Sequence, residues 1–314
     1  MSRARQRGVA LLVAIVIFAI ATMVAAAVTY NKAMAARRAA ATFTLEQALQ
    51  AGMAAEALAS IALENDAGQK TDTSQDWAQE QPPLEIEGTG VWIQGKVEDL
   101  QGRFNLNSVL KWENNQLVTD DHQVEVFRTL LRDLDIDIRY ADLLVDWIDP
   151  GIEPYGSAGG EDTLYLSQAP PYRPPNTFIT HTSELLAMPG FGRENYLKIA
   201  PYITALPNDA KVNVCTASGI ILDVTLDEQT SQFAGMNLPE EREKGCFPAM
   251  TTYLGAIGDG TKRDLVQRRV VENSDWFRLR TNIRIGTADF VLYSVLYREK
   301  TKKIRVVQRS FGSE

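Results

Sequence analysis

An uncharged run of twenty residues, from Val9 to Val28, lies close to the N-terminus. At about 1.5 Å of rise per residue, a helix of this length measures about 30 Å, which matches the hydrocarbon core of a bilayer. An alanine-rich stretch without proline follows the run. One uninterrupted helix is therefore predicted from Val9 to near Asn65. The remaining residues must fold as a body attached to this helix.

The charges on either side of the apolar run predict its orientation. Three arginines and no acidic residue precede it, which favours a cytoplasmic N-terminus and an exported body. Lys32, Arg37 and Arg38 lie on the far side and partly oppose this orientation. A cleaved signal peptide is the alternative, because the small residues 25–27 offer a cleavage site. The absence of any break after the run favours a helix that is kept.

Composition excludes several classes of protein. The 314 residues are 45% hydrophobic and 23% charged, as expected of a globular chain. A formal charge of −8 disfavours a general nucleic-acid binder. Two histidines, His122 and His181, leave little room for a multi-histidine metal site. Cys215 and Cys246 stand 31 residues apart in the exported body, where a disulfide is favoured over two free thiols.

Periodicity predicts an α+β fold. Alternation with a period of two indicates strands at 91–99, 212–214, 220–222, 276–285, 289–298 and 303–311. Helical spacing between the first two of these regions indicates helices at 122–134 and 140–148, one opening at 182, and another at 196–203. A β-region thus begins near residue 84, is interrupted by a compact helical insertion, and resumes near residue 209.

Several short segments resemble one known family. The start RQRGVALLVAIVI resembles a prepilin peptidase site, and the body adds VEDLQGRFNLNSV (97–109), DWIDP followed by GGED (146–162), PPYRPPNTF (170–178) and KVNVCTAS (211–218). These ordered segments span nearly the whole chain. Together they resemble the K-type minor pseudopilins of the type II secretion system.

The resemblance implies a type IV pilin-like fold, in which a long N-terminal helix packs on an antiparallel sheet and a large all-α domain is inserted in the β-region. The expected parts are a prepilin leader, a transmembrane and assembly helix, a first part of the β-domain, the inserted α-domain and a second part of the β-domain. Their expected bounds are, in that order, 1–8, 9–65, 66–115, 116–208 and 209–314.

The resemblance also implies a function without catalysis. The subunit would initiate and cap the pseudopilus that exports folded proteins across the outer membrane. Its expected partners are the I- and J-type minor pseudopilins, other pseudopilins, the prepilin peptidase and the inner membrane, with exported proteins as further candidates and nucleic acid excluded. The expected location is the bacterial inner membrane, crossed once, with the body in the periplasm.

Processing and assembly residues follow from the same resemblance. It implies cleavage after Gly8 and methylation of the new amine at Val9. Most members of the pilin superfamily have a glutamate at the fifth mature position, where this sequence has Val13. A buried ammonium in a membrane is costly, and such a glutamate neutralises the amine of the subunit added before it. A subunit with valine there is expected to be the first added and the topmost.

An acidic loop is the candidate metal site. Carboxylates at 146–162 are surrounded by proline and glycine, an arrangement that suits a hard cation such as Ca²⁺ as well as a solvated loop. The resemblance favours calcium and implies one or two ions. The ligands it implies are Asp149, Glu153, Glu161 and Asp162. Gly151 stands where the family tends to have a second acid.

Two other functions compete with this interpretation. Residues 185–199 resemble a helix-hairpin-helix, which would suit a membrane-anchored DNA-uptake protein. The cations Arg193 and Lys198 are balanced there by acids, so a tight turn between packed helices is favoured. The paired carboxylates of the acidic loop could alternatively serve a calcium-dependent anchored hydrolase. Neither histidine lies in a recognisable nucleophile motif.

Overall fold

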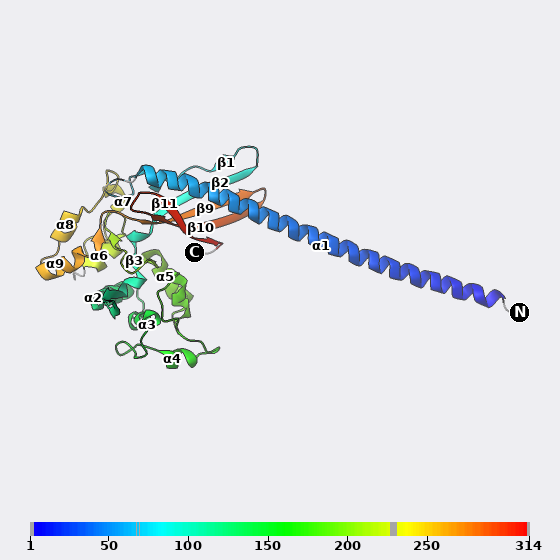
Figure 1. The fold of residues 1–314 in the computed structure, drawn as a ribbon, viewed down its shortest axis with the longest axis horizontal. Coiled ribbons are helices and arrows are strands. Elements are labelled where there is room, and N and C mark those ends of the chain that lie inside the picture. The colour runs from blue at the N-terminus through cyan, green and yellow to red at the C-terminus, as the bar shows by residue number, and fades with distance from the viewer. Residues whose placement is uncertain (1–2, 67, 69, 227–230, 313–314) are drawn as a thin grey trace.

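Helix α1 (Arg3–Asn65) dominates the computed structural model, which describes residues 3–66, 68, 70–226 and 231–312. The helix extends far beyond the rest of the chain (Figure 1). Its first half, from Val9, is exposed and is long and apolar enough to cross a membrane. The predicted continuous helix is therefore confirmed. Met1 and Ser2 of the predicted leader lie outside the described residues.

The second half of α1 lies on a five-stranded antiparallel sheet. The strand order is β1-β2-β9-β10-β11. The strands are β1 (Leu84–Ile86), β2 (Val91–Asp99), β9 (Trp276–Ile285), β10 (Ala288–Arg298) and β11 (Ile304–Phe311). Strands β2 and β9 are neighbours, with Asp99 opposite Phe277. Residues 100–275 are consequently a long excursion of the chain between two adjacent strands.

Alternating side chains join the sheet to α1. Inward residues such as Ile93, Leu279 and Leu292 are buried, as the strand periodicity predicts. On the helix, small residues face them and let the two layers approach closely. At Gly52 the approach leaves no room for a side chain, because a Cβ atom there would collide with the side chain of Leu292.

The excursion folds into a largely helical lobe. In Figure 1, α2 to α5 lie below strands β9, β10 and β11, whereas α1 passes above these three strands. The helices are α2 (Asp121–Asp133), α3 (Arg139–Ile148), α4 (Asp162–Leu166), α5 (Gly192–Ile199), α6 (Gly219–Leu226), α7 (Leu238–Glu241), α8 (Met250–Gly255) and α9 (Gly260–Gln267). Short strand pairs accompany them: β3 (Phe104–Asn105) with β6 (Ile203–Thr204), β4 (Leu110–Glu113) with β5 (Gln116–Thr119), and β7 (Val212–Asn213) with β8 (Val270–Val271). Short 3₁₀ turns complete the chain: η1 (Asp76–Ala78), η2 (Leu100–Gly102), η3 (Leu106–Val109), η4 (Thr182–Ala187) and η5 (Ala200–Tyr202).

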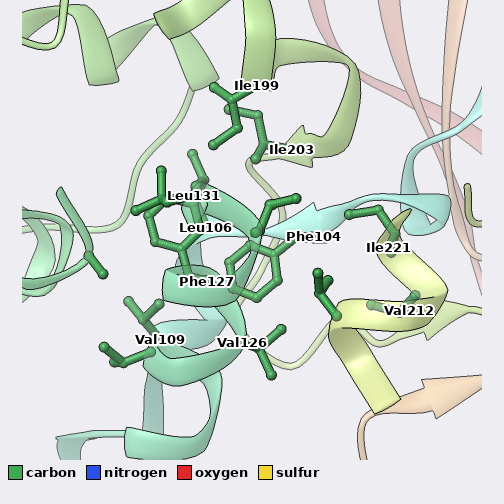
Figure 2. Packing of buried hydrophobic residues seen from close by; sticks show 14 of the residues in the cluster. Phe104, Leu106, Val109, Val126, Phe127, Leu131, Ile199, Ile203, Val212 and Ile221 are labelled. Carbon is green, nitrogen blue, oxygen red and sulfur yellow. The ribbon is translucent and has the colours of Figure 1, made fainter. Parts of the chain in front are cut away.

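The lobe has a hydrophobic core separate from the core under α1. Figure 2 shows its centre, where the rings of Phe104 and Phe127 stack with centroids 5.3 Å apart. In the same view, Ile199 and Ile203 lie above the two rings and Val126 lies below them. The excursion therefore has a contiguous hydrophobic core of its own.

One strand prediction is wrong. Residues 220–222 were expected to be extended, but they lie in helix α6, which packs on α2. An unbroken apolar run does not distinguish a buried strand from a buried helix. Helices α6 to α9 also fall outside the range 116–208 that the sequence suggested for the helical insertion.

Candidate functional site

The acidic loop connects α3 to α4. Asp142 and Asp146 lie four residues apart on α3 and therefore share a face. Asp149 ends the helix, and the chain then runs through a glycine-rich loop to Glu161, which precedes α4. Both ends of the loop thus bring carboxylates to one place.

Asp146 organises the loop from its centre. Its carboxylate is fully buried and accepts hydrogen bonds from the backbone N–H groups of Tyr155 (2.8 Å) and Gly160 (2.6 Å). A Cβ atom on Gly159 would collide with this carboxylate and with the Tyr155 backbone. Gly159 is therefore required by close packing around Asp146.

Two flanking aspartates have partners of their own. Asp142 forms a 2.5 Å ion pair with Arg128 on α2. Asp149 accepts a 2.8 Å hydrogen bond from the N–H of Gly151, at the position where the resemblance leads one to expect a second acid. These contacts fix where the chain leaves α3.

Glu161 is the least compensated acid of the loop. It is buried, and its Oε1 atom has no hydrogen-bond partner in the described structure. Burial raises the pKa of Glu161 to about 7, and nearby carboxylates add to the effect, namely those of Asp146, Asp149 and Asp162. Burial likewise raises the pKa of Asp146 to about 6. Such an excess of buried negative charge fits a hard divalent cation that takes oxygen ligands.

The predicted ligands separate into two groups. The carboxylates of Asp149 and Asp162 both lie close enough to Glu161 to raise its pKa, although Asp162 also pairs with Arg173 at 3.5 Å. Glu153 is exposed on the loop. Asp146 lies at the centre of the loop although the resemblance does not include it among the ligands. Its position one turn after Asp142 on α3 is the sequence signal that points to it.

The asparagines of the VEDLQGRFNLNSV segment hold backbone together. Asn107 donates from Nδ2 to the carbonyls of Ile179 (2.9 Å) and Leu206 (2.8 Å). Its Oδ1 accepts from the N–H of Ile179 at 2.8 Å. Asn105 donates to the carbonyl of Pro207 at 2.7 Å. Both side chains are buried and hydrogen-bond to distant parts of the backbone. These structural contacts account for the asparagines of the segment.

A second buried network joins the lobe to the sheet. Asp99, at the end of β2, accepts hydrogen bonds from the hydroxyls of Thr216 and Ser274, each at 2.6 Å. Asn213, in the KVNVCTAS segment, donates to Asp99 at 3.0 Å and to the carbonyl of Thr71 at 2.9 Å. Burial raises the pKa of Asp99, and the hydroxyl hydrogen bonds oppose that rise. The network fixes the point where the lobe leaves the sheet.

Cys215 and Cys246 form a disulfide. The bond joins Cys215, which lies two residues after β7, to Cys246 in the loop that follows α7. The carboxylate of Glu272 lies near both sulfur atoms and also accepts from the N–H of Met250 at 2.8 Å. Because both sulfurs are used in the disulfide, this group does not act as a metal site.

The helix-hairpin-helix segment serves as packing in this lobe. Leu185, Met188 and Phe191 are buried, and the Phe191 ring meets Tyr140 edge to face at 4.8 Å. Lys198 pairs with Glu194 at 3.6 Å. The turn therefore holds η4 and α5 together, as the sequence favoured.

The processing and assembly residues lie in α1. Gly8 and Val9 are both helical, and Val9 and Val13 are exposed. The helix geometry places Val13 about one turn after Val9, on the same side. The arrangement leaves these positions free to meet a membrane or another helix.

Comparison with known proteins decides the family. A family profile described as Type II secretion system (T2SS), protein K matches residues 102–208. A protein of Pectobacterium carotovorum subsp. carotovorum named Type II secretion system protein K is 30% identical over 325 residues, which cover 99% of this chain and 98% of the relative. The chain belongs to the type II secretion system protein K family.

Further comparisons agree with this assignment. A protein K of Pseudomonas aeruginosa is 30% identical over 323 residues, which cover 99% of this chain and 94% of that protein. A chain in the crystal structure of the GspK-GspI-GspJ complex from enterotoxigenic Escherichia coli is similar, with a TM-score of 0.76 and 22% identity. That match covers 88% of this chain and 100% of the other. The predicted family and the predicted pilin-like α+β fold are confirmed.

The family also decides between the competing functions. A member of the protein K family is a minor pseudopilin of type II secretion, as the sequence predicted. Neither the DNA-uptake protein nor the anchored hydrolase is supported by the comparisons. The protein is thus a component of a secretion machine.

Proposed function

We propose that this chain sits at the tip of the type II secretion pseudopilus, where it initiates assembly and caps the filament. The observation that carries the proposal is the excursion 100–275, which places a bulky lobe beside the pilin sheet. A lobe of this size on every subunit would crowd a helical filament. A single copy at the end has room for it.

The proposed partners are I- and J-type minor pseudopilins. A chain similar to this one is described in a GspK-GspI-GspJ complex. The exposed first half of α1 offers apolar and small side chains to neighbouring helices. Other pseudopilins would join below the tip through the same helix.

The proposed entry pathway begins with cleavage after Gly8 by a prepilin peptidase and methylation of the Val9 amine. The chain would then cross the inner membrane once, with its body in the periplasm. The basic leader supports this orientation, and the disulfide between Cys215 and Cys246 suits an oxidising compartment. Val13 would leave the subunit without the carboxylate that neutralises a preceding amine, which favours its addition first.

We further propose that the acidic loop holds calcium. Asp146, Asp149, Glu161 and Asp162 would supply carboxylate oxygens, and Glu161 contributes the buried oxygen that lacks a partner. Glu153 would reach an ion only if the exposed part of the loop turned inward. A bound Ca²⁺ would supply the positive charge that allows these carboxylates to remain ionised together. The role of the site is structural, so no catalytic step is assigned to it.

The proposal is tested by expressing the full chain together with a prepilin peptidase and with I- and J-type minor pseudopilins. The purified complex is analysed by intact mass spectrometry. We expect one copy of each minor pseudopilin and a chain that begins at methylated Val9. A chain that begins at Met1, or after residues 25–27, contradicts the entry pathway. A correctly processed chain that binds neither partner contradicts the tip assignment.

A further inference from the structure

Three cations follow the apolar run of α1: Lys32, Arg37 and Arg38. All three side chains are exposed. We infer that they form a cationic collar that binds the phosphate groups of anionic phospholipids at the membrane surface. The inference rests on the proposed insertion of α1 into a membrane. It assigns a ligand to residues that pilin-like assembly leaves unexplained.

The position of Lys32 along the helix fits a headgroup layer, and the two arginines lie within reach of that layer through their long side chains. Lys32 lies four residues after Val28, which is about 6 Å at 1.5 Å per residue. The polar layer on each side of a bilayer is about 5–8 Å thick. Arg37 and Arg38 lie about 14–15 Å beyond Val28. Their long side chains tilt toward the helix N-terminus, and therefore toward the membrane.

The collar encircles the helix. At about 100° per residue, Arg37 and Arg38 are rotated by about 140° and 240° from Lys32. A partner helix contacts one side of α1 and would meet only one or two of these charges. A membrane surface crossed by the helix surrounds it and can meet all three. Tyr30, just before the collar, is exposed and is the type of residue found at membrane interfaces.

The charge of the remaining chain supports the same ligand. Six of the 32 basic residues and none of the 40 acidic residues precede Glu46. The part from Glu46 onward therefore has 26 basic against 40 acidic residues. An anionic surface attracts the collar and repels the acidic body. These opposed forces hold the helix at a defined depth with the body away from the lipid.

The test uses the full chain in nanodiscs that contain equal amounts of phosphatidylglycerol and phosphatidylcholine. Native mass spectrometry measures the ratio of the two lipids that stay bound. The test variant is Lys32→Gln/Arg37→Gln/Arg38→Gln. The control variant, Arg193→Gln/Lys244→Gln/Lys300→Gln, removes the same charge from exposed positions of the body. The leader arginines are present in every sample, so differences between samples report the collar.

We expect the wild type and the control to retain phosphatidylglycerol preferentially. The collar variant should lose about fivefold in preference for each cation removed. The wild-type preference should also weaken as salt is raised, because surface charges are screened. Equal retention by wild type and collar variant overturns the inference while leaving membrane insertion intact. Failure of the wild type to insert even into pure phosphatidylcholine overturns both.

Discussion

Glu56 on α1 and Arg309 on β11, which are 253 residues apart in the sequence, form a bidentate ion pair. The Arg309 Nε and Nη2 atoms lie 2.8 Å and 2.7 Å from the two carboxylate oxygens of Glu56. Glu56 is only 3% exposed and also accepts from the hydroxyl of Ser294 at 2.6 Å. The last strand of the chain is thereby attached to the helix that the chain begins with.

Replacing Arg309 by methionine should destabilise this attachment. The substitution leaves the Glu56 carboxylate buried with one hydroxyl donor, so we expect a loss of roughly 2 kcal/mol of unfolding free energy, moderated by the partial exposure of Arg309. Chemical denaturation in detergent measures it. The control is Arg305→Met, which removes an exposed arginine 3.9 Å from Glu299 and should cost less than about 0.5 kcal/mol. Equal losses would show that the buried pair has no special role.

Enlarging Gly52 should force α1 away from the sheet. Because a Cβ atom at this position already meets Leu292, Gly52→Leu should destabilise the protein by about 1–3 kcal/mol or more. The matched change Ala54→Leu, on the exposed side of the same helix, should leave the melting temperature nearly unchanged. A Gly52→Leu protein with the wild-type melting temperature would mean that helix and sheet are packed more loosely than described.

Removing the disulfide should weaken the helical lobe. Closing a loop with a sequence separation of 31 restricts the unfolded chain, so Cys215→Ser/Cys246→Ser should lower stability by about 3–4 kcal/mol. Thermal melts are recorded with and without a dithiol reductant. The reductant should lower the melting temperature of the wild type and leave that of the double variant unchanged. An effect of the same size in both proteins would contradict the assignment.

Calcium should stabilise the lobe through Glu161. At a free concentration of one hundred times its dissociation constant, a ligand that binds the folded state contributes about 2.7 kcal/mol. Glu161→Gln should abolish the rise in melting temperature on addition of CaCl₂. In chelator, the variant should be at least as stable as the wild type, because a poorly compensated buried acid is removed.

The exposed acid of the same loop provides the comparison for the calcium experiment. Glu153→Gln should retain the calcium-dependent rise if the geometry of the loop is kept. A full response in Glu161→Gln would contradict the proposed site. Loss of the response in Glu153→Gln would show that the loop turns inward around the ion.

Val13→Glu should alter assembly order without affecting the folded body. The added carboxylate can neutralise the amine of another subunit, so the variant should be incorporated below the tip as well as at it. Native mass spectrometry of assembled tip complexes, with site-specific cross-links along α1, reports the position of each subunit. Complexes with the wild-type order in every case would contradict the role given to Val13.

Much of the fold was predictable because its patterns are long. Helix α1 and strands β2 and β9 each combine one periodicity with clear ends, and their bounds agree closely with those expected. Helix α6 was missed because its Ile221 and Leu222 are buried on a helix that is apolar on nearly every side. Its local sequence therefore lacks the polar face that marks an amphipathic helix.

The candidate site was predictable only in part. Sequence placed the carboxylates in one loop, but proximity along a flexible glycine-rich segment does not determine which of them turn inward. Glu153 is exposed while Asp146 lies at the centre, and that difference depends on the backbone N–H groups of Tyr155 and Gly160. Such contacts arise from the tertiary path of the loop.

The neighbouring positions of β2 and β9 have a mechanical consequence. The chain enters its excursion after Asp99 and returns opposite it at Phe277, so both ends of the lobe are fastened to the same spot of the sheet. A thrust along α1 passes into the sheet through the packed side chains and the Glu56–Arg309 pair, and the hydrogen bonds between β2 and β9 close the path outside residues 100–275. Force transmitted along a filament would therefore not stretch the lobe.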